Sequence, residues 1–543
     1  MGGGQVAKSY DVVISGGGAA GPALAIELSL RGIDVIVVEQ TERGAYKAPR
    51  TNLTNIRSME HFRRWGIADT HRASVPIDPD FPDDFAFVTR LNGYEIVRFE
   101  NAVASSGRND LFAENAVWAE QGTIERSLRD RVEAAPSAEY RWGTRVVGFE
   151  QMDDRVRVEL EHVATGERDE LECLYLAGCD GSRGVVRRGL GIRMEGKPDL
   201  NINSGMSLRA PALKSLCHVG LAVMYWFVND DVGGWLGPLD AEGTWFFHVI
   251  NPFPSDADPD SFEDMRRLLY MCVGEEFPVE YVSGGKWVTH SLLAPTMQQG
   301  RAFIAGDAAH LIPPTGGFGM NISLLDGVDL GWKLAATLGG WGGPRLLDTY
   351  TTERHAADRW VIDAQERNNR IKSEELHQDG MEAPGETGDR VRESVKRMIV
   401  TEKAQEFASL GCQLGYRYEG SPIVVDDGSP WPEVSQPVYV PSAHPGCLAP
   451  HRWLADDRSL YDVLGPEFTL LKTGGNGSAE AERIVNAARD RGLPLEFVEV
   501  GEPGLRALYE ADLALIRPDQ HVAWRGDVAP GDPAALVDRV RGA

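Results

Sequence analysis

A glycine-rich stretch that follows a short apolar run holds the residue types best suited to binding an electron-rich ligand. Phe303–Ile304 reads as a strand and Gly306-Asp307 as a turn, and Pro313-Pro314 and Gly316-Gly317 precede an expected helix over 321–338. Glycines let a planar group approach the backbone, since no Cβ stands in the way. A helix start offers unpaired N–H groups and a partial positive charge, and a carboxylate can accept hydrogen bonds from ligand hydroxyls. The stretch therefore predicts a site for an anionic or electron-rich planar ligand.

The N-terminal region carries a second ligand-binding pattern. An apolar strand, 10–15, runs into Gly16-Gly17-Gly18-Ala19-Ala20-Gly21, which is G-x-G-x-x-G, and an expected helix over 22–31 follows. A second strand, 34–39, ends at Glu39, which lies 18 residues past Gly21 and so near the separation expected for a carboxylate that binds a ribose. Together these features predict dinucleotide binding, but they do not distinguish FAD from NAD.

These two stretches resemble the flavin fingerprints of the para-hydroxybenzoate-hydroxylase family of single-component FAD monooxygenases. A third motif of that family is similar to Asp180-Gly181, and the resemblance spans essentially the whole chain. The second fingerprint favours FAD, and in the family its aspartate holds the ribityl and ribose hydroxyls while its helix start lies against the flavin ring. The residues expected at the cofactor are Gly16, Gly18, Ala19, Ala20, Gly21, Glu39, Gln40, Arg50, Gln121, Asp180, Asp307, Gly317, Gly319, Met320 and Asn321.

The resemblance implies a reaction. NAD(P)H would reduce the flavin, O2 would add to give a C4a-hydroperoxide, and an electron-rich aromatic or heteroaromatic ring of the phenol, hydroxypyridine or polyketide type would gain a hydroxyl. Such chemistry needs a water-poor pocket. Pro313, Pro314 and Gly319 are expected beside the reacting centre, the prolines as a rigid wall and the glycine in the helix start that stabilises the reduced flavin. No general base can be named. The sequence has no second Rossmann unit, so NAD(P)H is expected as a transient cosubstrate.

A β-rich, aromatic region over 201–288 is expected to form an antiparallel sheet with one face against the flavin domain. In the family such a sheet roofs the substrate pocket. Tyr225, Trp235 and Phe246 are the expected substrate contacts, although any one of these rings could equally be core. The nearest histidines, including His248 and His310, are expected to be structural.

The expected fold class is α/β: a Rossmann-like FAD-binding domain with an inserted antiparallel β-sheet substrate domain, plus a C-terminal thioredoxin-like α/β domain. The last domain is implied by resemblance to the phenol-hydroxylase and polyketide-hydroxylase branch. It has no Cys-x-x-Cys and so cannot be a disulfide oxidoreductase; packing or oligomerisation is its expected role. The expected FAD-binding segments are 1–76, 111–195 and 291–412, the substrate segments 77–110 and 196–290, and the thioredoxin-like domain 413–543.

Composition and charge argue against several classes of binding partner. The formal net charge of −26 argues against nucleic acid as a partner. The six cysteines have no zinc-type spacing, so no metal is expected. No apolar run is long enough for a membrane span. We expect a cytoplasmic enzyme of natural-product biosynthesis or aromatic catabolism that takes a small aromatic substrate and O2, with association into a homo-oligomer left open.

Three other interpretations stay open. On the same scaffold, Baeyer–Villiger oxygenation of a ketone would give an ester. A flavin-dependent halogenase is less favoured, because the sequence has no Trp-x-Trp-x-Ile-Pro. A non-catalytic flavin-binding scaffold would bind its partners through the C-terminal domain. Product structure separates the oxygenase reactions, and bound flavin without turnover would favour the scaffold.

Overall fold

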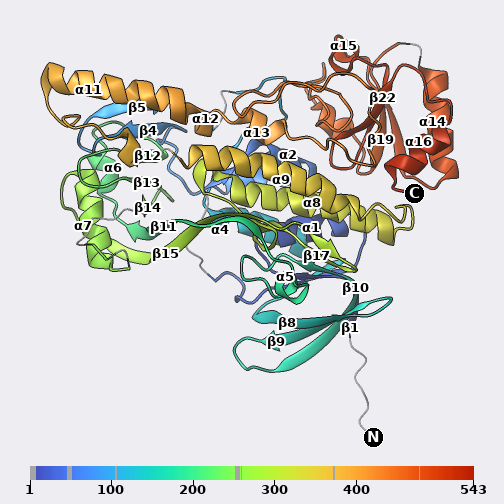
Figure 1. Ribbon diagram of the computed structural model, residues 1–543, viewed down its shortest axis with the longest axis horizontal. Helices are drawn as coiled ribbons and strands as arrows, with labels where there is room; N and C mark the ends of the chain where they lie inside the picture. The colour runs from blue at the N-terminus through green and yellow to red at the C-terminus, as the bar shows by residue number, and fades with distance from the viewer. Residues whose placement is uncertain are drawn as a thin grey trace, which may run out of the picture.

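The computed structural model describes residues 8–45, 52–103, 107–250, 257–258, 260–370, 373–475 and 477–543. A parallel β-sheet with its helices forms the centre, an antiparallel sheet lies at one end, and a C-terminal α/β domain lies at the other (Figure 1). The long helices α8 (Phe318–Leu338) and α9 (Thr349–Asn368) lie in the middle of this arrangement (Figure 1). The predicted α/β class is confirmed.

The central sheet is the predicted Rossmann-like core. Its main path is β16 (Gln298–Gln299), β17 (Ala302–Ile304), β10 (Arg168–Gly178), β1 (Lys8–Ser15), β2 (Val35–Val38) and β7 (Ala138–Arg141). The five strands from β17 to β7 are parallel, and the hairpin of β8 (Thr144–Gln151) and β9 (Val156–His162) extends from β10. The valines and isoleucines of β1 and β2 are almost fully buried, as expected for strands covered on both faces.

Helix α1 (Ala20–Ser29), which follows the G-x-G-x-x-G motif, packs directly against α8. A Cβ on Gly327 would lie 2.6 Å from the carbonyl oxygen of Ala20, and one on Gly331 would lie 2.4 Å from the Cβ of Glu27. These two glycines therefore allow the helix axes to approach more closely than larger residues would.

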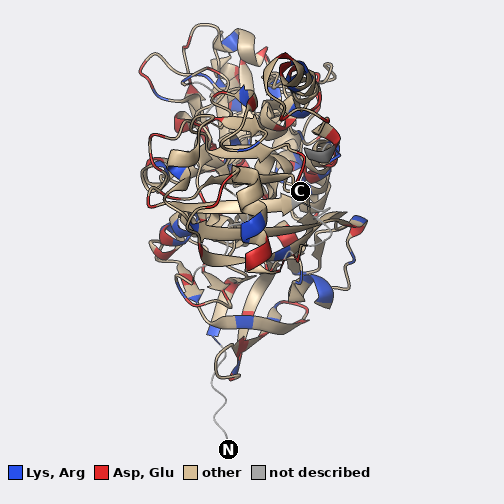
Figure 2. Ribbon diagram, turned by 90° about the vertical axis from the view of Figure 1, so that its left-hand side faces the viewer, with Lys and Arg blue, Asp and Glu red and all other residues tan. Residues whose placement is uncertain are grey.

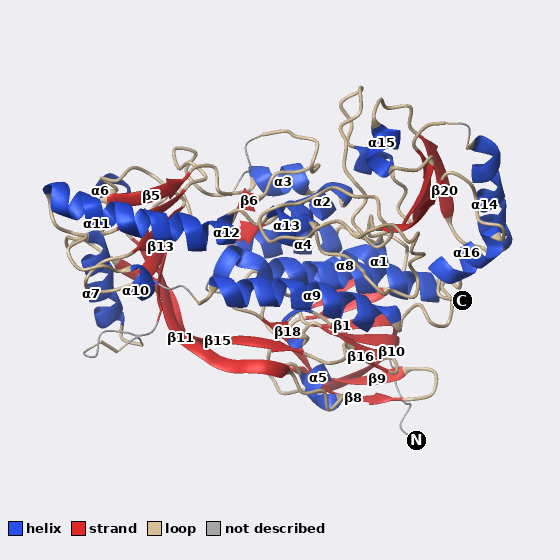
Figure 3. Cartoon of the chain, turned by 45° about the horizontal axis from the view of Figure 1, so that its top comes forward, coloured by secondary structure: helices blue, strands red, loops and turns tan. Residues whose placement is uncertain are grey.

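The second sheet is antiparallel apart from one parallel pair. Its order is β18 (His310–Leu311), β15 (Glu280–Leu293), β11 (Glu195–Arg209), β14 (Thr244–Ile250), β13 (Gly234–Pro238), β12 (Met224–Phe227), β4 (Phe85–Val88) and β5 (Glu95–Phe99), with β12 and β4 parallel. Helix α7 (Phe262–Val273) contributes Leu268, Leu269 and Cys272 to its core. Figure 3 shows the long strands β11 and β15 reaching from this sheet to the central one.

The C-terminal domain has the predicted thioredoxin-like arrangement. Strand β19 (Phe468–Lys472), helix α14 (Ser478–Asp490) and β20 (Leu495–Glu499) form a parallel unit, and β21 (Leu513–Ile516), β22 (Val522–Gly526) and α16 (Pro533–Val540) follow. The strand order is β20-β19-β21-β22, and β21 is antiparallel to both of its neighbours.

Shorter elements connect these parts. They are β3 (Leu53–Thr54), α2 (Ile56–Arg64), α3 (Ala68–Ala73), β6 (Val117–Trp118), α4 (Gln121–Glu133), α5 (Val185–Gly189), α6 (Leu213–Leu216), η1 (Gly306–Ala308), η2 (Thr315–Gly317), α10 (Ser373–Leu376), α11 (Gly385–Met398), the π-helical turn η3 (Ile399–Lys403), α12 (Ala404–Phe407), α13 (Leu410–Leu414), η4 (Leu460–Val463) and α15 (Leu505–Tyr509).

Two surface features bear on partners. Acidic and basic residues are interspersed along the elements seen in Figure 2. Among the described residues, no helix combines the length and the apolar character that crossing a membrane requires.

Candidate active site

Four sequence motifs meet at one edge of the central sheet. Strands β1, β2, β10 and β17 run parallel, and their last residues are in register: Ser15 pairs with both Val38 and Gly178, and Gly178 pairs with Ile304. The segments that follow these strand ends contain Gly16–Gly21, Glu39, Cys179–Asp180 and Gly306–Asp307. Ligands of open α/β sheets bind at the carboxyl ends of the strands, so the structure brings the predicted cofactor motifs together where a ligand is expected.

The three glycines of the first motif have different environments. A Cβ on Gly16 would lie 2.2 Å from the carbonyl oxygen of Cys179, and one on Gly21 would lie 2.1 Å from that of Gly16. In contrast, no described atom lies within 4 Å of the position of a Cβ on Gly18. Helix α1 begins at Ala20 without a side-chain cap. A pyrophosphate can therefore approach the backbone at Gly18 and accept hydrogen bonds from the helix start.

Glu39 is held beside the glycine motif. Its Oε2 accepts a hydrogen bond of 2.7 Å from the N–H of Gly17, and its Oε1 accepts from the N–H and the hydroxyl of Thr41 at 2.9 and 2.8 Å. A carboxylate has about four acceptor positions, so one stays available for a ribose hydroxyl. The neighbouring Gln40 is exposed.

A buried ionic pair shapes the turn that carries Asp307. The Oδ2 of Asp326 accepts from the N–H of Gly306 and lies 2.9 Å from the Nε2 of His310, and its Oδ1 accepts from Arg354 at 2.8 Å. Burial disfavours the charged forms, but the opposite charges outweigh it: the pKa of His310 is raised to about 9 and the pKa of Asp326 is lowered to about 2. Gly306 adopts φ +64°. The turn is thereby fixed, and Asp307 is exposed at the sheet edge.

The start of α8 is a second helix start at the site without a side-chain cap. Its N-cap Gly317 has φ +68° and follows Gly316 at +70°. The N–H groups of the first turn, including those of Gly319 and Met320, have no partner within the helix. Both residues keep accessible surface, whereas Pro313 is buried and Pro314 is exposed.

Asn321 positions this helix start through its side chain. Its Oδ1 accepts from the N–H of Asn55 at 2.9 Å and the hydroxyl of Ser58 at 2.7 Å, and its Nδ2 donates to the carbonyl oxygens of Leu53 and Gly317 at 2.9 and 2.7 Å. The amide is fully buried. These four bonds tie the β3–α2 segment to the glycine-rich loop.

The other predicted cofactor residues have varied surroundings. Asp180 lies at the sheet edge, and its Oδ2 accepts from the N–H groups of Val185 and Val186 at 2.8 and 3.1 Å, so it fixes the start of α5. Burial raises the pKa of Asp180. Gln121 is the first residue of α4 and donates to Glu125 at 2.7 Å. Arg50 lies outside the described residues.

Two of the three predicted substrate residues share one face of the antiparallel sheet. Trp235 pairs with His248, and two residues further along β13 Gly237 pairs with Phe246, so Trp235 and Phe246 point to the same side. Tyr225 pairs with Leu236 and points to the opposite side. Its hydroxyl donates to the carbonyl oxygen of Gly220 and accepts from the N–H of Ala222, both at 2.9 Å. The structure therefore separates Tyr225 from the other two.

The face that carries Trp235 and Phe246, called here the aromatic face, is connected to the glycine-rich loop through Trp118 and Leu53. The ring of Phe246 lies 6.5 Å from that of Trp118, and Trp118 pairs with Leu53 between β6 and β3. The Cβ of Leu53 lies 3.2 Å from the position that a Cβ on Gly317 would take. The aromatic face thus stands beside the start of α8.

A buried ion pair absent from the sequence-based site links the same two parts. The Nζ of Lys403 lies 4.4 Å from the ring centre of Trp226 on the aromatic face, and it donates to Glu406 at 2.6 Å. Glu406 in turn accepts from the N–H of Gly316 at 3.1 Å. The pair lies about ninety positions from the loop in sequence, and no local signal marks it.

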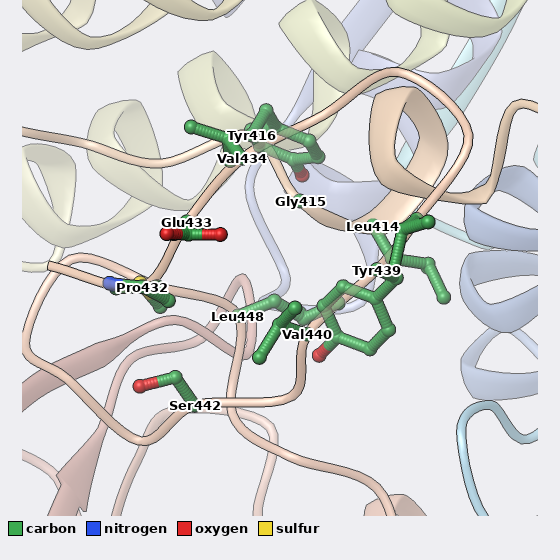
Figure 4. A pocket seen from close by; sticks show the side chains of 12 residues that line it. Leu414, Gly415, Tyr416, Pro432, Glu433, Val434, Tyr439, Val440, Ser442 and Leu448 are labelled. Atoms are coloured by element: carbon green, nitrogen blue, oxygen red, sulfur yellow. The ribbon is translucent and has the colours of Figure 1, made fainter.

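Two hollows lie outside the cofactor motifs. The cavity in Figure 4, between the end of α13 and the segment around Tyr439, has a volume of about 10 Å³ and can hold one water at most. An open cleft of about 760 Å³ lies on the C-terminal domain and is lined by residues between Leu454 and Glu502. None of the predicted site residues lines either hollow.

Comparison with known proteins decides the family. A profile described as FAD binding domain matches residues 9–365, and one described as aromatic-ring hydroxylase, C-terminal matches residues 442–543. The chain belongs to the FAD-dependent aromatic-ring hydroxylases. The FAD-dependent monooxygenase apdD of Emericella nidulans is 31% identical over 95% of this chain and 87% of its own length. Aklavinone 12-hydroxylase RdmE of Streptomyces purpurascens is 30% identical over 98% of both chains.

A solved structure agrees over the whole fold. The structure described as chromopyrrolic acid-soaked RebC with bound 7-carboxy-K252c matches with a TM-score of 0.90 and 35% identity, covering 99% of this chain and 100% of that one. The predicted family, fold class, FAD cofactor and monooxygenase activity are therefore confirmed, with NAD(P)H as the cosubstrate typical of the family and a small aromatic molecule as substrate. The Baeyer–Villiger and scaffold alternatives are not favoured.

Proposed function

We propose that this monooxygenase uses O2 to hydroxylate a planar, electron-rich aromatic ring of the phenol or polyketide type, in natural-product biosynthesis. The ring would bind between the aromatic face and the start of α8. The observation that carries the proposal is the contact path from Phe246 through Trp118 and Leu53 to Gly317, because it brings an aromatic wall to the loop that would hold the flavin ring. RdmE, by its name, hydroxylates aklavinone, a relative's substrate that fits this class.

The residues of the cofactor edge have separable roles in this proposal. The backbone at Gly18 and the start of α1 bind the pyrophosphate, and Glu39 and Asp307 accept hydrogen bonds from the cofactor's hydroxyls. Bound FAD supplies electron transfer from NAD(P)H and the activated oxygen. The N–H groups of Gly319 and Met320 stabilise negative charge next to the helix start, since that end of a helix carries a partial positive charge. Gln121 and Asp180 are the remaining cofactor-binding residues in this proposal.

Exclusion of water is the second task of the chain. Trp235 and Phe246 present apolar rings, and the fixed backbone of Pro313 and Pro314 forms the rigid edge of the loop. A water-poor site keeps activated oxygen from being lost as hydrogen peroxide. The chain thereby couples consumption of NAD(P)H to hydroxylation.

A substrate panel tests the proposal. Purified protein with FAD would be offered phenols, hydroxypyridines and hydroxylated anthraquinones, and NAD(P)H oxidation would be followed with and without each compound. The proposal predicts that at least one compound accelerates NAD(P)H oxidation and returns with a new ring hydroxyl. An ester product with ring expansion, or no accelerated oxidation across the panel, would contradict it. Association into a homo-oligomer and a cytoplasmic location stay predictions.

A further inference from the structure

One histidine, His248, lies within the aromatic face and makes no hydrogen bond to the described residues there. His248 of β14 is ringed by Trp287, Phe246 and Trp235, with ring centres 5.0, 5.3 and 6.2 Å away. It keeps accessible surface despite these neighbours. In the described part of the chain, neither of its ring nitrogens has a hydrogen-bond partner. A side chain with one donor and one acceptor is thus presented to whatever binds against the aromatic face.

The sheet is built to admit this imidazole. His248 pairs with Gly205 across β14 and β11, and a Cβ on Gly205 would lie 2.4 Å from the Cδ2 of His248 and 2.9 Å from the Cζ3 of Trp287. On the other side of Gly205 stands Gly285, and no described atom lies within 4 Å of the position of a Cβ there. Any larger residue at 205 would displace the histidine, so the glycine and the imidazole act as a unit.

The surroundings of His248 favour the uncharged form of its imidazole. Burial lowers the pKa of His248 to about 4, so the ring is uncharged at neutral pH. Lys403, a cation that lies over Trp226 of this face, is neutralised by Glu406 at 2.6 Å. An uncharged imidazole favours an uncharged polar group in the ligand, because a carboxylate would need a cation to replace its hydration.

We infer that a ring nitrogen of His248 accepts a single hydrogen bond from an uncharged phenolic hydroxyl of the substrate, and so selects hydroxylated rings over carboxylated or methylated ones. The inference rests on the proposed function, since it places the substrate against the aromatic face. His248 orients the hydroxyl and leaves its proton in place, because so weak a base does not deprotonate a phenol. The ring position that is oxidised is then fixed relative to that hydroxyl.

Binding can be measured without turnover. Quenching of tryptophan fluorescence would report the dissociation constants of 2-naphthol, 2-methoxynaphthalene and 2-naphthoate with FAD-loaded protein. The wild type is expected to prefer 2-naphthol. His248→Leu should weaken 2-naphthol binding by about three- to tenfold, the range of one hydrogen bond, and leave 2-methoxynaphthalene within twofold. His248→Gln, which restores a polar group, should recover part of the loss.

Controls separate this inference from the proposed function. His290→Leu alters a histidine of β15 that accepts a hydrogen bond from the N–H of Asp199 at 3.1 Å, and it should leave all three affinities unchanged. The flavin content of each variant reports whether its fold is intact. If His248→Leu loses FAD, the His248→Gln and His248→Asn variants test the role of His248 instead.

A wild type without preference for 2-naphthol, or a preference that survives removal of the imidazole, overturns the assignment of His248. Absence of hydroxylated product from the wild type would instead count against the proposed function, while the titrations still decide the role of His248.

Discussion

Arg517 of the C-terminal domain and Glu353 of α9 form a bidentate ion pair, with Nη1–Oε1 and Nη2–Oε2 distances of 2.6 and 2.8 Å. Both side chains are completely buried. Glu353 also accepts from Lys333 of α8 at 2.6 Å, and Arg517 lies 3.3 Å from Asp329 of the same helix. The C-terminal domain therefore completes a buried network on the helix whose start lies at the cofactor site.

Loss of this guanidinium should destabilise the whole protein. Arg517→Met leaves the carboxylates of Glu353 and Asp519 with fewer partners in a buried site, and breaking a buried pair from one side costs about 3–5 kcal/mol. Thermal unfolding followed by circular dichroism should show a clearly lower midpoint, with easier loss of FAD. Arg491→Met is the matched control, because Arg491 pairs with Asp538 at the surface and such pairs contribute about 1 kcal/mol or less. Equal midpoints for the two variants would contradict the account.

Substitution by valine should impair FAD binding at Gly18 but folding at Gly21. Gly18→Val fills open space, so the protein should fold normally but bind FAD at least tenfold more weakly, as measured by titrating apoprotein with FAD. Gly21→Val forces a Cβ into a position 2.1 Å from the carbonyl oxygen of Gly16, so it should give little folded protein. Tight FAD binding by Gly18→Val would refute the assigned approach of the pyrophosphate.

Asp307 should matter for cofactor retention rather than for folding. The residue is exposed at the sheet edge, and loss of a charge-assisted hydrogen bond costs about 1.5–3 kcal/mol, so Asp307→Ala should reduce FAD affinity roughly tenfold or more. The ratio of flavin to protein absorbance measures this directly. Asp363→Ala, an exposed aspartate on α9, serves as the control. Unchanged flavin content in the Asp307 variant would rule out the role proposed for it.

The His310–Asp326 pair should give a defined pH dependence. The pKa of His310 is raised from 6.5 to about 9, so its stabilisation is fully present below pH 6.5 and is lost as pH rises through about 9. Asp326, lowered to about 2, contributes above its ordinary pKa and loses its effect only in strong acid. The difference in unfolding midpoint between wild type and His310→Gln should therefore shrink between pH 6.5 and 9. A difference that stays constant over this range would show that His310 is uncharged.

The sequence could predict the cofactor edge because its signals are local. Gly16, Glu39 and Gly306 each follow a short apolar strand, and parallel strands bring their carboxyl ends to one edge. The face of each aromatic residue could not be predicted in the same way. Tyr225, Trp226 and Phe227 are all apolar and all buried, so alternation gave no sign that Tyr225 points away from Trp235.

Contacts between distant segments could not be predicted from local sequence patterns either. Strand β7 pairs in parallel with β2, and its four residues are too few for a sequence pattern to identify that partner. Arg57 donates to Gln520 at 2.7 Å, and Lys403 lies over Trp226. Both pairs join segments that are distant in the sequence, and only the assembled fold brings them together.

Transfer of one oxygen atom from O2 to the aromatic ring is the central claim, and isotopically labelled O2 tests it most directly. With FAD, NAD(P)H and the best substrate of the panel, mass spectrometry of the product should show one labelled oxygen as a new ring hydroxyl, in near-equal amount to the NAD(P)H consumed. Label found only in hydrogen peroxide, or a hydroxyl derived from water, would contradict the account.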